Sequence, residues 1–319
     1  MIQNRSSRKF RLILTCILFT GLLYGQQVPK GPVSYKVFAP LILNPAIAGS
    51  KDFTRLHMQT MVSGANNSQA ISIHSRFRSN NSGTAETDDI SFSNFGFGGY
   101  AFHEMMENSR NIGGGISGAF HLPLGAARVS GLSIGVSAHA LYNIIPAGSE
   151  YVGTFENSMT PGVDLGILYY GPVGFAGFSS RNLTSLLTDS IPRINDELSL
   201  PLEHLFFGGL KFLVSRSREI VFEPSLIVNV NDSLIDATVD NLTPILKVYV
   251  QNACFGAILQ NFHAPSFFLQ YQFPTFYLGV LAKLPGKEIL LDNRQVRIEL
   301  SLGLNLGNSA RSNADQYRW

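Results

Sequence analysis

The side chains in this sequence that could bind a metal ion or transfer a proton are scattered. Four histidines, His57, His74, His121 and His139, fall on the polar faces of different segments. None has a His-x-x-x-His or Cys-x-x-Cys neighbour, so the spacing of a metal site is missing. A polar residue lining the inside of the fold accounts for each of them. We therefore predict no metal site.

Carboxylates occur close together at two places, Glu104 with Glu107 and Asp88 with Asp89. A catalytic pair needs shielding that shifts one of the two pKa values. Both pairs lie in hydrophilic stretches, so we expect them to be solvated charges in turns.

The run Gly113-Gly114-Gly115 precedes no basic residue of the phosphate-loop type, and it lies in a strand-like pattern. It indicates close strand packing rather than a nucleotide site. No Gly-x-Ser-x-Gly nucleophile motif is found. The net charge is only +2 and Lys and Arg form no stripe, which argues against nucleic acid binding. We predict no catalytic residue, no cofactor and no enzyme activity.

The segments that carry these residues alternate between apolar and polar positions. The pattern is clearest over residues 296–306. Its apolar positions are Val296, Ile298, Leu300, Leu302, Leu304 and Leu306. A period of two predicts a β-strand with one apolar face. The length matches the ~9–11 residues of a membrane-spanning strand.

About fourteen such segments follow one another, and an even number suits a closed antiparallel barrel. They begin near Phe53, Gln69, Ile90, Ile112, Val129, Val163, Val173, Glu203, Glu219, Thr243, Ala253, Ser266, Thr275 and Val296. The segment from Ile90 changes phase at Gly98-Gly99, which predicts a bulge. The segment from Glu219 contains Pro224, which costs a ladder hydrogen bond.

The composition favours a barrel in a membrane over a soluble sandwich. Only 14% of the residues are charged, while 45% are hydrophobic. The polar faces carry Ser, Gly, Asn, Gln, Thr and His, which suits a narrow lumen, and the apolar faces suit lipid. Aromatic residues near segment ends could form interfacial girdles: Phe102, Tyr142, Tyr169, Tyr170, Phe262 and Tyr277. A soluble periplasmic β-protein is the alternative fold.

Residues 1–25 have the pattern of a signal peptide, with a basic front and an apolar core too short to span a bilayer. Cys16 lies in that core, so Cys254 is the only cysteine of the mature chain and no disulfide can form within it. The predicted organisation is a signal peptide (1–25), an N-terminal segment (26–52), a β-barrel (53–306) and a polar tail (307–319).

The N-terminal segment contains the run Asn44, Pro45, Ala46, Ile47, Ala48, Gly49, Ser50. An Asn-Pro step favours a turn. Small residues then allow close backbone approach, and Gly49 permits a conformation that other residues avoid. We expect this run to make a defined turn at or inside the periplasmic mouth and to have a structural role.

This run, after a signal peptide and before the first strand, resembles the PorP/SprF family of Bacteroidota outer-membrane proteins. The similarity extends over residues 34–306. Further family-like steps are residues 159–170, Gly177-Phe178-Ser179, Asn182-Leu183, Glu223-Pro224-Ser225-Leu226, residues 276–280 and residues 296–306.

The resemblance implies a fourteen-stranded outer-membrane barrel of the type IX secretion and gliding-motility system. Such a barrel assists export or surface anchoring of adhesin-like cargo that bears a C-terminal sorting domain. Implied partners are this cargo, the translocon, periplasmic anchoring components and outer-membrane lipid. The alternative function is an outer-membrane transporter or porin for hydrophobic small molecules.

Overall fold

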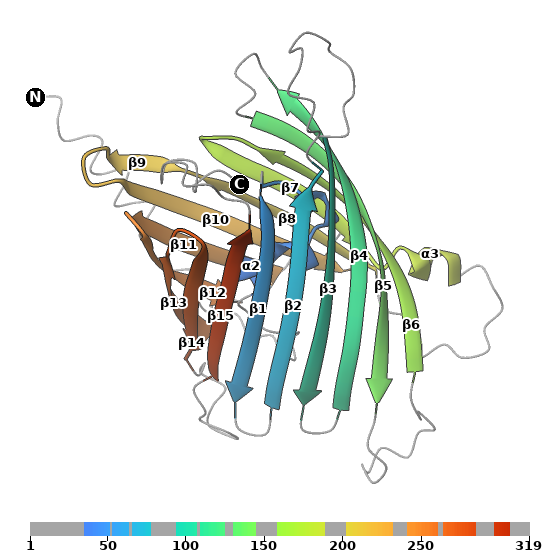
Figure 1. Cartoon of the computed structure of the whole chain (residues 1–319). Helices are drawn as coiled ribbons and strands as arrows, with labels where there is room; N and C mark the ends of the chain where they lie inside the picture. Colours follow the sequence, from blue (N-terminus) through green and yellow to red (C-terminus); the bar gives the residue numbers. More distant parts are fainter. Residues whose placement is uncertain are drawn as a thin grey trace, which may run out of the picture.

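A computed structural model describes most of the chain after residue 34, and the described part is almost entirely β-sheet (Figure 1). It describes residues 35–51, 53–63, 66–77, 94–106, 109–124, 130–144, 158–188, 202–231, 241–260, 264–284 and 297–306. The predicted signal peptide, the polar tail, and Asp88 and Asp89 lie outside these residues.

The strands run antiparallel in chain order around the molecule. They are β1 (Thr54–Ser63), β2 (Asn66–Arg76), β3 (Phe95–Met106), β4 (Ser109–Leu124), β5 (Ser130–Ile144), β6 (Ser158–Tyr170), β7 (Gly174–Arg181), β8 (Glu203–Leu210), β9 (Phe212–Ser215), β10 (Ile220–Asn231), β11 (Leu242–Val250), β12 (Ala253–Gln260), β13 (Ala264–Gln272), β14 (Phe276–Lys283) and β15 (Arg297–Leu306). Each of the fourteen predicted segments contains one of them.

The sheet closes on itself because β15 pairs with β1 and β10 pairs with β11. β8 and β9 both pair with β10 and are separated only by Lys211. They therefore act as one interrupted strand, and the barrel wall has fourteen strand positions. Pro224 of β10 lies opposite this interruption, next to the last β8 pair, Ser225↔Gly209. The missing proline N–H therefore falls where the neighbouring strand is already broken. The prediction of a closed fourteen-stranded antiparallel barrel is confirmed.

The faces of the strands point as the alternation predicts. On β15, Ile298 and Leu300 are exposed on the outer wall, while Glu299 and Ser301 are buried inside. β1 repeats the arrangement, with Met58 outside and His57 inside. Of the predicted girdle residues, Tyr142 and Tyr169 are exposed on the outer wall. Phe262 lies outside the described residues.

Five details of the prediction are wrong: the places of Tyr277, Phe102 and Tyr170, the turn at Glu104, and the bulge in β3. Tyr277 is 1% exposed and packs in the lumen; Phe102 and Tyr170 also face inward, because each lies on the same face of its strand as buried lumen residues. Glu104 is on the lumen face of β3 rather than in a turn. The register between β2 and β3 runs from Asn67↔Met105 to Arg76↔Gly96 without a shift, so no bulge interrupts the glycines of β3.

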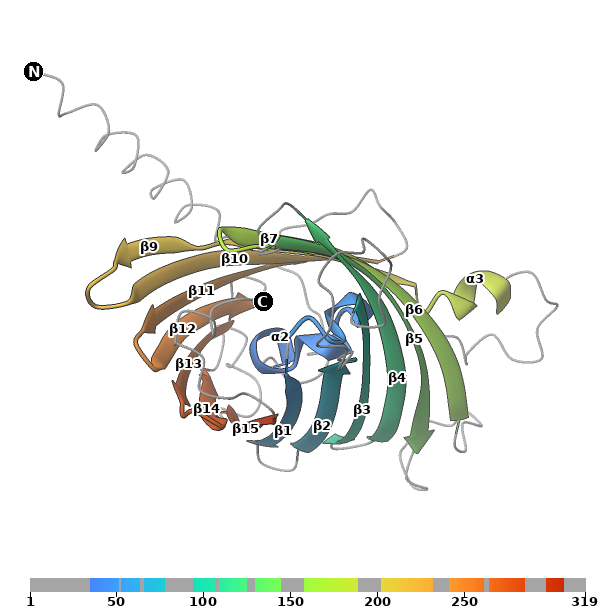
Figure 2. The same cartoon turned by 45° about the horizontal axis from the view of Figure 1, so that its top comes forward.

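The segment of residues 35–50, which precedes β1, lies inside the barrel (Figure 2). It forms α2 (Tyr35–Phe38) and two 3-10 turns, η1 (Pro40–Ile42) and η2 (Pro45–Ile47). We call residues 35–50 the plug segment. A further short helix, α3 (Thr184–Thr188), follows β7. Among the described residues, neither helix has the length and apolar character required to cross a bilayer.

Candidate functional site

The Asn-Pro turn of the plug segment is closed by a hydrogen bond to its own side chain. Asn44 is in an extended conformation and caps η2, because its Oδ1 accepts a hydrogen bond of 2.8 Å from the Ala46 N–H. Pro45 occupies the first position of η2, where its missing N–H costs nothing. The residue types at this step therefore dictate the turn before any contact with the barrel is made.

The other end of the Asn44 amide anchors the turn to the wall. Its Nδ2 donates to the carbonyl oxygens of Ile167 on β6 (3.2 Å) and Phe178 on β7 (3.0 Å). Asn44 is fully buried. Gly166 makes this approach possible, because a Cβ at that position would lie 2.1 Å from the Asn44 Oδ1. A single amide thus caps the turn and joins two strands.

Hydrogen bonds from the wall supply partners for further backbone carbonyls of the plug segment. Its internal hydrogen bonds use the carbonyls of Tyr35, Ala39, Pro40, Asn44, Pro45 and Ile47. The carbonyls of Leu43, Ala46 and Ala48 instead accept from Ser179, Ser133 and His121, each at 2.7 Å.

The Phe38 carbonyl accepts a longer bond of 3.4 Å from the Tyr277 hydroxyl. Because a buried carbonyl without a partner is costly, the strands supply what the short helices cannot.

His121 has a defined tautomer as a result. The Ala48 carbonyl can only accept, so His121 Nε2 carries the proton and donates to it. Nδ1 then accepts from the Tyr170 hydroxyl at 3.3 Å, and Arg76 donates to the Tyr170 oxygen at 3.1 Å. This chain of donors runs from β2 through β6 and β4 to the plug segment.

Glycines let the turn and the wall touch backbone to backbone. Gly49 has φ of +70°, and a Cβ there would lie 2.5 Å from Gly96 Cα. A Cβ on Gly96 would lie 2.2 Å from the Ala48 carbonyl oxygen. On β5, a Cβ on Gly135 would lie 2.4 Å from the Ala46 nitrogen. The turn and the wall therefore fit closely because glycines on both of them have no side chain at the contact.

The opposite side of the lumen holds the plug segment by apolar contact. Phe38 is 3% exposed and meets Phe268 edge-to-face, with ring centroids 5.9 Å apart. Around it lies a buried cluster of Leu205, Ile227, Ile245, Cys254, Ile258, Phe268, Tyr277 and Leu281. Beside this cluster, Lys36 donates to the Thr243 hydroxyl at 3.0 Å. Burial, with help from Lys283, lowers the pKa of Lys36 to about 8.

Two buried clusters of polar side chains in the wall contain residue types that are found in catalytic sites. Asp164 accepts from Ser137 at 2.8 Å and from the Asn182 N–H at 3.0 Å, and His139 lies 3.2 Å away. The serine therefore donates to the carboxylate and not to a histidine base, unlike an activated nucleophile.

The second cluster is the ion pair Lys247–Glu223, 3.0 Å long, which joins β11 to β10. Within the described part of the chain, no three His, Cys, Asp or Glu residues lie together in a way that could hold a metal ion.

The residues of the predicted motif lie together in the structure, whereas the candidate histidines lie on four different strands. Asn44, Pro45, Ala46, Ala48, Gly49 and Ser50 are all buried. The four histidines face the lumen from β1, β2, β4 and β5. Sequence reasoning missed the residues that receive the turn, above all Ser133, Ser179, Gly96 and Gly166. The alternating small residues on the polar faces of β3, β5, β6 and β7 carried that signal.

Comparisons with solved structures find outer-membrane barrels at low identity. Omp33 of Acinetobacter baumannii is 11% identical with a TM-score of 0.43, covering 81% of this chain and 100% of that one. The KdgM porin, solved in complex with disordered oligogalacturonate, is 9% identical with a TM-score of 0.38, covering 78% and 98%. The NanC porin is 7% identical with a TM-score of 0.38, covering 79% and 100%. A search of curated proteins finds no match.

The family comparison is more specific than these likenesses. The model of the type IX secretion system membrane protein PorP/SprF matches residues 32–304, a range that includes the plug segment and nearly the whole barrel. The chain belongs to the PorP/SprF family of type IX secretion system membrane proteins.

Proposed function

We propose that this protein assists the secretion and cell-surface anchoring of particular cargo proteins and catalyses no reaction. It is an outer-membrane barrel of a secretion-system family. The cargo would be adhesin-like proteins with a type IX C-terminal sorting domain. Translocon and periplasmic anchoring components would be its other partners.

The observation that carries this proposal is the plug segment inside the lumen. It contacts the wall from Ser68 on β2 around to Tyr277 on β14. The cavity between it and the strands near Lys36 has a volume of about 20 Å³, room for about one water molecule. A lumen crossed in this way supports a barrel that acts through its surfaces over one that conducts solutes.

The connections between strands support an orientation for this barrel. Six connections lie at the end where β1 begins and β15 finishes, and all of them except residues 77–94 have five residues or fewer. At the other end, four of the seven connections have ten residues or more, namely 145–157, 182–202, 232–241 and 284–296. Outer-membrane barrels have short periplasmic turns and longer extracellular loops. We therefore place the chain termini and the Asn44 turn toward the periplasm.

The Asn44, Pro45, Ala46, Ala48, Gly49 and Ser50 motif would then have a structural role, which is to hold the plug segment in its seat. Its hydrogen bonds go to the wall and its own backbone. These hydrogen bonds all have protein partners, so none of them requires a bound ligand.

Deletion of the gene tests the cargo role. Surface proteomics of the deletion strain should show the loss of one or a few type IX cargo proteins. Uptake of hydrophobic small molecules should be unchanged. Normal display of every cargo would refute the proposal. Flux of such molecules through liposomes that contain the purified barrel would instead favour the transporter function.

A further inference from the structure

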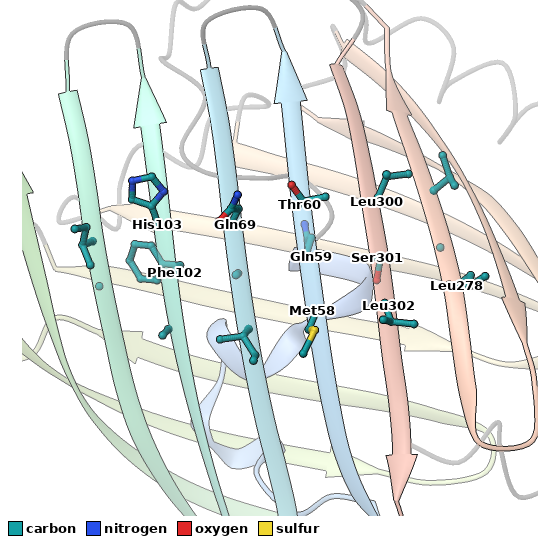
Figure 3. Close-up of a pocket in the computed structure, with 17 residues that line it drawn as sticks. Met58, Gln59, Thr60, Gln69, Phe102, His103, Leu278, Leu300, Ser301 and Leu302 are labelled. Atoms are coloured by element: carbon teal, nitrogen blue, oxygen red, sulfur yellow. The ribbon is translucent and has the colours of Figure 1, made fainter.

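The outer wall has an apolar groove on the far side of the sheet from the plug segment. Its volume is about 820 Å³, and it crosses β14, β15, β1, β2, β3 and β4 (Figure 3). Figure 3 shows the outward-facing labelled side chains at two levels of neighbouring strands, with the plug segment behind the wall.

The lower level is a row of apolar and small residues. Across the strands it runs Leu278, Leu302, Met58, Ile71, Ala101 and Gly114. Met58 and Ile71 are about 40% exposed. Of this row, the small side chain of Ala101 lines the groove on β3, where it leaves room beside Met58 and Ile71. The shape and chemistry of this row fit a hydrocarbon chain that lies along the wall.

The level above it changes from apolar to polar between β15 and β1. Val280 and Leu300 continue the apolar surface on β14 and β15, but the same row continues as Thr60, Gln69 and His103. These three side chains stand side by side in Figure 3. Polar groups on the outer wall of a barrel are expected only where the hydrocarbon of the bilayer ends.

A cation completes this polar group. Arg110, exposed on β4, donates from Nε to His103 Nε2 at 2.8 Å. Its row also contains Asn67 on β2, between the exposed side chains of Val62 and Met105. Among the described outward-facing residues of these two rows on β1 to β4, none is a carboxylate, and Glu104 faces the lumen. The group therefore offers N–H donors and a positive charge, which match a phosphate.

We propose that this groove is a binding site for a phosphorylated lipid of the outer leaflet. Arg110, His103, Gln69 and Thr60 would hold the headgroup phosphate, and an acyl chain would lie over Met58, Ile71 and Ala101. The site lies next to the hairpins of residues 64–65 and 107–108, at the end opposite the chain termini. With the termini toward the periplasm, this end is at the outer leaflet. The proposal rests on that orientation and not on the cargo role.

Native mass spectrometry of the full-length barrel tests the headgroup site. The protein would be measured in detergent supplemented with bisphosphorylated lipid A, and separately with phosphatidylcholine. We expect lipid A to be retained in preference, and Arg110→Ser to reduce its affinity about tenfold. The matched control is Arg216→Ser, which removes an exposed arginine near the β9–β10 turn at the opposite end. Equal losses in the two variants would overturn the proposal.

A second pair of variants tests the acyl groove. Ala101→Trp should fill the room beside Met58 and Ile71 and reduce lipid A retention. Ala138→Trp, at an exposed outer position of β5, should not. Heat-modifiable gel mobility of each variant shows that the barrel is folded. Unchanged lipid A retention in folded Ala101→Trp, together with lost co-purification of another membrane protein, would overturn the proposal in favour of a protein partner.

Discussion

The two sides of the lumen hold the plug segment by different kinds of interaction. On the side of β3 to β7, the Asn44 turn is received by directional hydrogen bonds from His121, Ser133 and Ser179 and by glycines in the wall. On the side of β8 to β14, Phe38 enters an apolar cluster whose one bond to the plug backbone comes from Tyr277 at 3.4 Å.

The difference separates position from stabilisation. Hydrogen bonds and backbone contacts tolerate little displacement, so the polar side fixes where the segment lies. Apolar burial is non-directional and roughly proportional to the area buried. The apolar side therefore stabilises the plug segment without fixing its position. Four variants test whether this division is real.

Gly49→Val should have the largest effect. It puts a β-branched side chain at φ +70°, with its Cβ 2.5 Å from Gly96 Cα. We expect a loss of more than about 4 kcal/mol, seen as lost heat-modifiability and reduced outer-membrane levels. The control is Gly118→Val, since a Cβ on Gly118 meets nothing within 4 Å. A folded Gly49→Val barrel at normal levels would show that the polar side does not fix the turn.

Phe38→Ala should be the next largest. It empties a buried aromatic site, which costs about 3–5 kcal/mol. The measurement is the urea midpoint of unfolding in lipid vesicles. Phe267→Ala on the outer face of β13, 53% exposed, serves as the control and should change the midpoint far less. Equal effects would mean that Phe38 contributes no more than a lipid-facing ring.

Ser133→Ala should cost about 1–3 kcal/mol, because it leaves the buried Ala46 carbonyl without its donor. Ser117→Ala is the matched control, since within the described chain the Ser117 hydroxyl is buried and has no hydrogen-bond partner. The same unfolding assay would compare the two. A loss in Ser117→Ala as large as that in Ser133→Ala would contradict the hydrogen-bond account.

The smallest effect should be a pH dependence from Lys36 on the apolar side. Its pKa falls from 10.5 to about 8 in the folded state, so the unfolded chain binds more protons between these values. Stability should therefore rise from about pH 8 to pH 10.5, because over that range the unfolded chain keeps the proton that the folded chain has lost. Lys36→Met should remove this rise. A rise of the same size in Lys36→Met would assign it to another group.

The wall could be predicted from the sequence because each strand obeys one local rule. Residues 296–306 alternate strictly, and their outward leucines and inward Glu299 follow directly. The turn at Asn44 was also predictable, since Asn, Pro and Gly act through their own backbone preferences.

The apolar half of the lumen was not predictable in this way. Ile258, Phe268 and Leu281 point inward although they are as apolar as their lipid-facing neighbours. Their burial depends on Phe38, which lies more than two hundred positions earlier in the chain. The alternation of apolar and polar residues within one strand gives no information about a packing partner so far away in the sequence. The same reason explains why Tyr277 and Phe102 looked like girdle residues.

The closure of the wall between β1 and β15 has a consequence for how the protein reaches its native state. The plug segment touches strands from β2 to β14, and the ring then closes through an unbroken ladder from Thr54↔Leu306 to Val62↔Ile298. We expect the segment to be in place before that ladder forms, because the finished ring encircles it. The first described residues of the chain would thus act as a template around which the last strand completes the barrel. A defect in the turn would therefore stall biogenesis at an open, unsealed sheet rather than yield an empty pore.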